Sequence, residues 1–269
     1  MSSRRGENAN PGGQKIALRL VKVFVQVTCK ASPPTLVLIP SLGRGGEDFL
    51  ELSALLSGLG YQVLVVEPFG MRPEEDIATA DLVTLAEHVL RAAPEEAQLV
   101  LIGHAFGNWV ARMAGTLAPA RTLAIVLLAA AKREIPAEIR PSINGSFDPS
   151  LSDEERLEHL RRAYFAPSQD ARVWVDGWHP ALAEGQRAAA ARTDRAIWWG
   201  AGGVVPILDV QAEHDAIAPA SKAHELRDEL GPRVTPVIIR DAGHALVPEQ
   251  PGEVARVIHA FLDGLIAMR

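Results

Sequence analysis

The stretch Leu99-Val-Leu-Ile-Gly103-His-Ala105-Phe-Gly107 decides how the rest of this chain is interpreted. Its first four residues form an apolar run, which is typical of a strand covered on both faces. A helical pattern follows at once, over Phe106–Leu117. Because the chain must turn sharply between strand and helix, Gly103 and Gly107 stand where a side chain would obstruct the turn. The stretch therefore predicts a strand, a tight turn that presents Ala105, and a helix.

The same alternation continues on both sides of this stretch. We expect further strands at Thr35–Ile39, Gln62–Val66, Leu123–Leu128, Val205–Val210 and Thr235–Ile239, with one or two earlier strands within Ala17–Thr28. Helical stripes of apolar residues cover Leu52–Leu59, Leu82–Val89, Ala218–Leu230 and Val254–Leu265. Strands separated by helices predict an α/β fold, with a mostly parallel central sheet of the eight-strand type flanked by helices on both faces.

The alternation stops between residues 132 and 203, where the pattern is helical but irregular. This segment contains four of the five tryptophans, and we predict that it is a helical lid inserted into the core. The core itself is then formed by residues 15–131 and 204–269. Residues 1–14 are polar and rich in glycine, asparagine and serine, which predicts a flexible N-terminal tail. Charged residues interrupt the apolar stretch that follows, so we expect a strand there rather than a signal peptide.

Net charge, apolar runs and cysteine content indicate which kinds of binding partner the chain can have. The formal net charge is -6, and the basic residues are scattered, which disfavours binding to nucleic acid or to anionic membranes. No apolar run approaches the roughly 20 residues that span a bilayer. The single cysteine, Cys29, cannot form an internal disulfide. We therefore expect a cytoplasmic protein that acts on a small molecule; the oligomeric state is not predicted.

In this context, the turn around Ala105 resembles the nucleophile elbow of the α/β-hydrolase superfamily, and the resemblance covers about residues 35–265. The resemblance implies that Ala105 occupies the nucleophile position. It also implies that the backbone N–H groups of Leu42 and Phe106 form an oxyanion hole. The preceding loop departs from the family, because Pro40 and Ser41 replace the His-Gly pair that many members carry there.

The resemblance further implies an acid and a histidine. Asp215 follows the strand after the insertion and best matches the family's acid, with Glu213 as the alternative. His244, in the Asp-Ala-Gly-His loop before the last helix, matches the family's histidine. The order of nucleophile position, acid and histidine is the one that this fold uses. The acid would orient the imidazole and stabilise its cation, and the imidazole would act as a base.

Alanine at position 105 excludes an ordinary acyl-enzyme pathway through that residue, because alanine has no nucleophilic atom. Four explanations are open: a natural alanine with His244 acting as a base, a natural alanine in a protein that only binds ligand, an engineered Ser-to-Ala change, or a nucleophile at Ser41. We favour a natural alanine, because the Pro40-Ser41 loop also departs from the pattern. The sequence Gly-His-Ala-Phe-Gly-Asn at the turn, which includes Asn108, also resembles that of some bacterial family members.

The insertion carries candidate pocket residues. Trp174, Trp178 and Trp198 are expected either to pack within the lid or to form an apolar wall over the substrate pocket, since aromatic side chains are common in such walls. No spacing of histidine, cysteine and carboxylate residues suggests a metal site, and nothing indicates a cofactor.

The sequence thus favours a hydrolase that acts on a small, mostly apolar organic molecule through a His-Asp catalytic dyad. The alternatives are a catalytically silent binding protein and a serine esterase or hydrolase inactivated by a Ser-to-Ala change.

Overall fold

The structure is a computed structural model that describes residues 33–130 and 135–267. The predicted tail and the predicted strands within Ala17–Thr28 lie outside the described residues. The strands are β1 (Thr35–Ile39), β2 (Gln62–Val65), β3 (Leu99–His104), β4 (Thr122–Leu128), β5 (Ile207–Ala212) and β6 (Val234–Ile239). The helices are α1 (Leu50–Gly58), α2 (Leu82–Ala92), α3 (Gly107–Leu117), α4 (Arg140–Gly145), α5 (Asp153–Ala163), α6 (Pro180–Ala191), α7 (Arg195–Trp198), α8 (Glu225–Leu230), α9 (Leu246–Glu249) and α10 (Pro251–Ala267).

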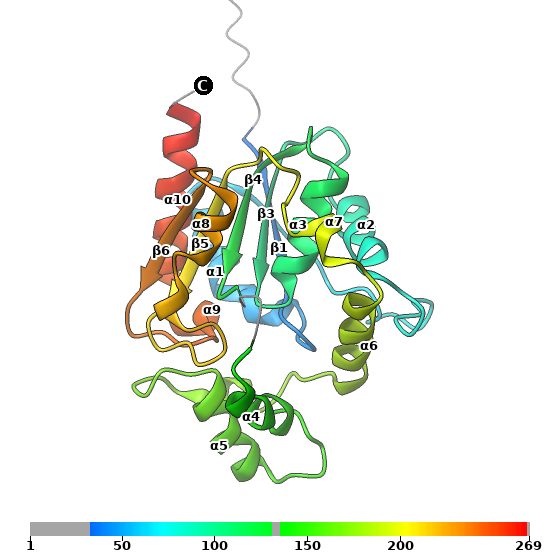
Figure 1. Cartoon of the computed structure of the whole chain (residues 1–269), viewed down its shortest axis with the longest axis vertical. Helices are drawn as coiled ribbons and strands as arrows, with labels where there is room; N and C mark the ends of the chain where they lie inside the picture. Colours follow the sequence, from blue (N-terminus) through cyan, green and yellow to red (C-terminus); the bar gives the residue numbers. More distant parts are fainter. Residues whose placement is uncertain (1–32, 131–134, 268–269) are drawn as a thin grey trace, which may run out of the picture. The chain divides into compact units, whose positions relative to one another are not determined.

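The described strands form one sheet in the order β2-β1-β3-β4-β5-β6, and every neighbouring pair is parallel. Each of the six agrees with the strand predicted from sequence to within two residues at either end. β3 continues beyond its predicted end because Gly103 and His104 pair with Leu127 and Leu128 of β4. The turn after β3 therefore starts at the sheet's carboxyl edge, where the other loops of a parallel sheet also converge (Figure 1).

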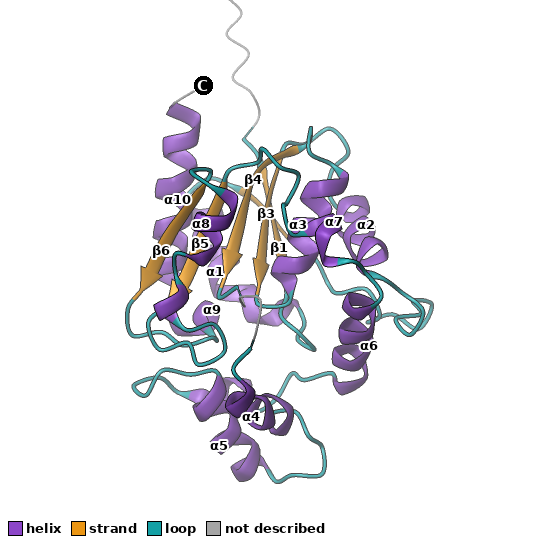
Figure 2. Ribbon diagram, viewed as in Figure 1, coloured by secondary structure: helices purple, strands orange, loops and turns teal. Residues whose placement is uncertain are grey.

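Helices cover both faces of this sheet (Figure 2). Because side chains alternate along a strand, the odd-numbered residues of β1 and β3 pack with α2 and α3, whereas the even-numbered ones pack with α1 and α10. The β1 pair Val37 and Leu38, both fully buried, shows this division. The two-layer core explains why the strand sequences are continuous apolar runs.

The segment between β4 and β5 contains α4–α7, and Figure 1 shows α4 and α5 beyond the carboxyl ends of the strands. Residues of α4, α5 and the loops after them form an apolar cluster that also includes Ile217 and Ala245 of the core. The end of the segment packs on the core instead. α7 contacts α3, and Trp198 belongs to the apolar cluster on the α2–α3 face of the sheet.

One predicted helix is shorter in the structure than the sequence indicates. The stripe Ala218–Leu230 gives only a short 3-10 turn, Ala220–Lys222, and then α8 from Glu225. The carboxylate of Asp215 accepts hydrogen bonds from the backbone N–H groups of Ile217 and Ala218 at 2.8 and 2.7 Å. That turn, followed by Pro219 with ψ of 134°, holds the start of the predicted helix in a loop.

Within the described part of the chain, no helix is long and apolar enough to cross a membrane.

The close packing of the turn after β3 can be tested by adding one methyl group. A Cβ atom at Gly103 would lie 2.3 Å from the carbonyl oxygen of Gly107, and one at Gly107 would lie 2.3 Å from that of Ile39. We expect Gly103→Ala and Gly107→Ala each to lower the free energy of unfolding by at least about 2 kcal/mol, the scale of overpacking in a close-packed site. Urea denaturation measures the change.

Gly264→Ala is the matched control for these two variants. Gly264 lies inside α10, and an added Cβ would meet nothing within 4 Å. This change should stabilise the helix by about 0.5–1 kcal/mol. Equal, small effects of all three substitutions would contradict the packing described for the turn.

Candidate functional site

The turn after β3 holds Ala105 in a strained conformation. Its φ is 48°, in the left-handed region that residues with a side chain rarely adopt, and such strain costs of order 1–3 kcal/mol. The N–H of Ala105 donates to the carbonyl of Leu128 at 2.9 Å, and its carbonyl accepts from the side-chain amide of Asn108. Asn108 is fully buried, so both peptide groups of the strained residue are held by the core.

Two residues that line the cavity with Ala105 have backbone N–H groups with no acceptor among the described residues. Leu42 and Phe106 line the same cavity as Ala105. Among the described residues, neither N–H donates a hydrogen bond to a protein acceptor. The structure thus brings together the two residues whose backbone groups were predicted from sequence to bind an oxyanion.

His244 and Asp215 form a buried hydrogen-bonded pair, with Nδ1 of His244 and Oδ2 of Asp215 2.8 Å apart. The other oxygen of Asp215 accepts the two backbone N–H groups described above, so the carboxylate is held on both sides. Because a carboxylate only accepts hydrogen bonds, this geometry places the proton of a neutral imidazole on Nδ1 and leaves Nε2 as the acceptor nitrogen. His244 also lines the cavity described below.

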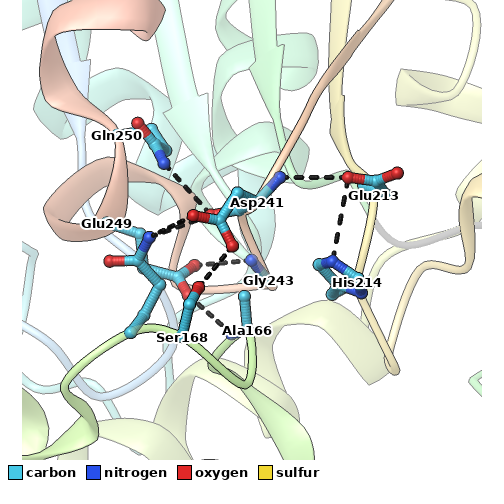
Figure 3. Close-up of polar contacts among 9 residues, drawn as sticks. Ala166, Ser168, Glu213, His214, Asp241, Gly243, Glu249 and Gln250 are labelled. Carbon is cyan, nitrogen blue, oxygen red and sulfur yellow. Dashed lines mark hydrogen bonds and ion pairs between the residues drawn. The ribbon is translucent and has the colours of Figure 1, made fainter.

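Glu213, the alternative acid, lies elsewhere (Figure 3). Its carboxylate accepts from the backbone N–H of Asp241 at 3.1 Å and lies 3.7 Å from His214. About half of its side chain is exposed, whereas that of Asp215 is fully buried. The structure therefore brings Asp215, not Glu213, to His244.

His104 supports the loop that carries His244. It is fully buried, and its Nε2 donates to the carbonyl oxygen of His244 at 2.8 Å. Burial, and next the nearby His244, lower the pKa of His104 to about 4, so the ring is neutral near neutral pH. Its Nδ1 is buried without a hydrogen-bond partner among the described residues. This side chain serves as a fixed donor to the loop rather than as a titrating base.

A cavity of about 430 Å³ lies over Ala105, within the range usual for small-molecule sites. Its walls come from the core and from the segment between β4 and β5. The lining residues are Ser41, Leu42, Ala105, Phe106, Trp109, Ile135, Arg140, Ile143, Asn144, Tyr164, Arg187, Ile217 and His244. Ser41 is buried at the cavity wall, next to Leu42.

The three tryptophans that were expected either to pack within the lid or to cover the pocket do not line it. Trp174 is almost fully buried and packs edge-on against Tyr164, with ring centroids 5.4 Å apart, so it stands behind the residue that lines the cavity. Trp178 packs in the same aromatic group. Trp198 lines a different hollow beside α3. Trp109 of α3 is the tryptophan that lines the cavity.

The loop after β1 is clamped by the segment between β4 and β5. The N–H of Gly43 donates to the side chain of Gln186 at 2.8 Å, and the carbonyl of Gly43 accepts from the N–H of His179 at 2.9 Å. Arg44 is buried, paired with Asp48 at 2.5 Å, and its guanidinium lies 4.9 Å from the centroids of both Trp174 and Trp178. The position of the Leu42 N–H thus depends on contacts with the inserted segment.

Glu249 ties the same segment to the His244 loop (Figure 3). Its two carboxylate oxygens accept the backbone N–H groups of Ala166 and Gly243, each at 2.7 Å. The N–H of Ala245 donates to the carbonyl of Tyr164 at 2.8 Å. Burial raises the pKa of Glu249 to about 7, against the lowering effect of the two N–H donors.

Sequence reasoning missed Arg140, Arg187 and Glu249. The two arginines lie in the irregular inserted segment, where no motif marks them. Glu249 lies five residues after His244. It is the one carboxylate between His244 and Pro251, the first residue of the last helix, and this position could have identified it.

In residues 33–130 and 135–267, no cluster of histidine, cysteine and carboxylate side chains is arranged to hold a metal ion.

Comparison with known proteins identifies the fold. A family model described as "Alpha/beta hydrolase family" matches residues 36–257. No curated protein matches the chain.

Solved structures show the same architecture. An alpha/beta hydrolase from Novosphingobium aromaticivorans is 22% identical with a TM-score of 0.66, over 87% of this chain and 90% of that one. A thermophilic esterase from Thermogutta terrifontis is 20% identical with a TM-score of 0.67, over 86% and 90%. A carboxylesterase structure from Nitrososphaera gargenis is 15% identical with a TM-score of 0.68, over 88% and 93%. At these identities the likeness shows the fold alone.

The raised pKa of Glu249 predicts how stability depends on pH. In the unfolded chain this carboxyl ionises near its ordinary value, and in the folded protein only near pH 7. Between these values the unfolded state binds fewer protons, so this group makes the free energy of unfolding fall as pH rises. We expect Glu249→Gln to flatten that fall, as measured by urea denaturation at a series of pH values.

Glu51→Gln, at an exposed position of α1, is the control and should leave the pH profile unchanged. A parallel profile for Glu249→Gln and the unsubstituted protein would contradict the prediction.

Proposed function

Because the chain belongs to the alpha/beta hydrolase family, we propose that it is a hydrolase without a covalent nucleophile, in which His244, oriented by Asp215, acts as a general base. Its substrate would be a small organic molecule with a largely apolar body and a carbonyl group, held over Ala105. The observation that carries this proposal is the intact His244–Asp215 pair beside a position that holds only a methyl group.

In the proposed reaction, the Nε2 lone pair of His244 takes a proton from water in the cavity. The resulting hydroxide attacks the substrate carbonyl, and the oxygen that becomes negative is stabilised by the N–H groups of Leu42 and Phe106. The imidazolium that forms is stabilised by Asp215, and it returns the proton to the leaving group as the carbonyl re-forms. Ala105 leaves room for the water where the family's elbow would place a side-chain nucleophile.

The nucleophile position also supports a second function, which is ligand binding without turnover. Removing the nucleophile of a working triad costs on the order of 10⁶ in turnover, and the strained turn persists here without it. A protein of this kind would keep the cavity and lose the chemistry. An engineered Ser-to-Ala change would leave the same arrangement, and the experiments below separate these cases.

Slow hydrolysis of activated acyl esters tests the general base. The unsubstituted protein should hydrolyse p-nitrophenyl esters without an initial burst, since no acyl-enzyme forms. His244→Gln should lower that rate by about 10²-fold or more, the usual contribution of a general base. Steady-state and burst-phase kinetics measure both effects.

His214→Gln is the matched control, because His214 is partly exposed and lies against Glu213 rather than in the cavity. If His244→Gln hydrolyses the esters as fast as the unsubstituted protein, the base mechanism is wrong and the binding function is favoured.

Restoring a nucleophile tests the rest of the site. Ala105→Ser should produce burst kinetics and raise ester hydrolysis by at least about 10³-fold, because the pair and the free N–H groups are already in place. The double variant Ala105→Ser/His244→Gln should lose this gain. If Ala105→Ser folds but hydrolyses the esters no faster, the rest of the site is not that of a working serine hydrolase. That result would argue against an engineered Ser-to-Ala change.

A further inference from the structure

Two arginines give the cavity over Ala105 a positive charge. Arg140 of α4 and Arg187 of α6 line it together with Ala105 and His244, and its lining contains no aspartate or glutamate. Both arginine side chains are exposed, which places them at the open end of the cavity. The chain as a whole has a formal net charge of -6, so this charge is opposite to that of the molecule.

Asn144 lies close to one arginine and on the same helix as the other. The guanidinium of Arg187 donates to Oδ1 of Asn144 at 3.1 Å and lies 5.2 Å from the centroid of Phe147. Arg140 lies four residues before Asn144 on α4, and side chains at this spacing are neighbours on a helix surface. All three residues line the same cavity.

Among residues 33–130 and 135–267, Arg140 and Arg187 form no ion pair with a carboxylate, in contrast to Arg44 with Asp48 and Arg156 with Asp153. Arg187 also favours the ionised form of Tyr164, another residue of the cavity wall, although burial dominates and raises the pKa of Tyr164. Two guanidinium groups beside one amide form a donor set suited to an oxyanion.

Most of the remaining wall is apolar. Leu42, Phe106, Ile143 and Ile217 line the cavity, and Ser41, Tyr164 and His244 are its other polar residues. A ligand that satisfies the whole surface has an anionic group at the arginine end and an apolar body that reaches Ala105.

We infer that the natural ligand is an organic anion, an apolar chain or ring that carries a carboxylate bound by Arg140, Arg187 and Asn144. This inference rests on the proposed function, because it concerns the same cavity and names the substrate class. A phosphate monoester shares the oxyanion chemistry, and the probes below separate the two.

Calorimetric binding of compounds with one tail tests the inference. The probes are octanoate, mono-octyl phosphate, 1-octanol and octylamine, titrated into the full chain. We expect octanoate to bind at least about tenfold more tightly than 1-octanol, the value of one charge-assisted contact, and octylamine most weakly. Added salt should weaken octanoate binding and leave 1-octanol binding unchanged. Tighter binding of mono-octyl phosphate than of octanoate would overturn the carboxylate assignment.

Substitutions locate the anion. Arg187→Gln and Arg140→Gln should each reduce octanoate affinity about five- to tenfold with no change for 1-octanol, and Arg187→Lys should retain part of the preference. Arg162→Gln is the matched control, since Arg162 is exposed on α5 and does not line the cavity. Circular dichroism confirms that each variant is folded.

His244→Gln separates this inference from the proposed reaction. If octanoate keeps its advantage over 1-octanol in His244→Gln and loses it in the arginine variants, the anion lies at the arginine end, whatever the ester kinetics show. If His244→Gln loses the advantage and the arginine variants keep it, the inference is wrong. Equal affinities for octanoate and 1-octanol, or no binding of octanoate, would also overturn it.

Discussion

The close approach of β3 and α3 to the end of β1 is the constraint on which the site depends. The backbone of Gly107 passes so near the carbonyls of Ile39 and Pro40 that a Cβ atom has no room, and Gly103 faces the same restriction from Gly107. This contact holds Ala105 at a positive φ and places it beside the loop that begins at Pro40. Leu42, in the loop after β1, and Phe106, at the start of α3, line one cavity because the loop and the helix approach each other so closely. Without the two glycines, the loop and the helix could not approach each other closely enough to share a wall.

The segment between β4 and β5 is joined to the core on two sides of the cavity. On one side, Gln186 and His179 bond to both peptide groups of Gly43. On the other side, the carboxylate of Glu249 accepts the N–H groups of Ala166 in the segment and of Gly243 in the His244 loop. The carbonyl of Tyr164 accepts the N–H of Ala245. These bonds join backbone to backbone, to the buried Gln186 or to the partly buried Glu249, so they define the cavity's shape more firmly than exposed contacts would. The segment therefore positions the groups of the site and supplies the arginines that face its ligand.

The side chains of Asp215, His244 and His104 are polar and buried, and burying such groups is costly unless they are hydrogen-bonded. Leaving one partner of a buried pair uncompensated costs several kcal/mol, and here Asp215 is satisfied by His244 and two N–H groups. His104 is buried in its neutral form and supports the carbonyl of His244. Such an arrangement contributes orientation more than stability. Its persistence beside an alanine is the physical basis for assigning the histidine a role that does not require a covalent nucleophile.

The sequence by itself predicted the parallel α/β sheet, the alternation of strands and helices along the chain and the two glycines of the turn after β3, because periodicity and local turn requirements are written in neighbouring residues. Asp215 and His244 were expected from the resemblance to the hydrolase family, not from periodicity. It could not choose Asp215 over Glu213 by physical argument, since that choice depends on which carboxylate the loops bring to the imidazole. It left two positions open for the tryptophans and overlooked Arg140, Arg187 and Glu249, because the inserted segment has no regular pattern. Only the tertiary structure decided those positions, since contacts between residues 80 or more apart in the chain, such as Ala166 with Glu249, leave no local signal.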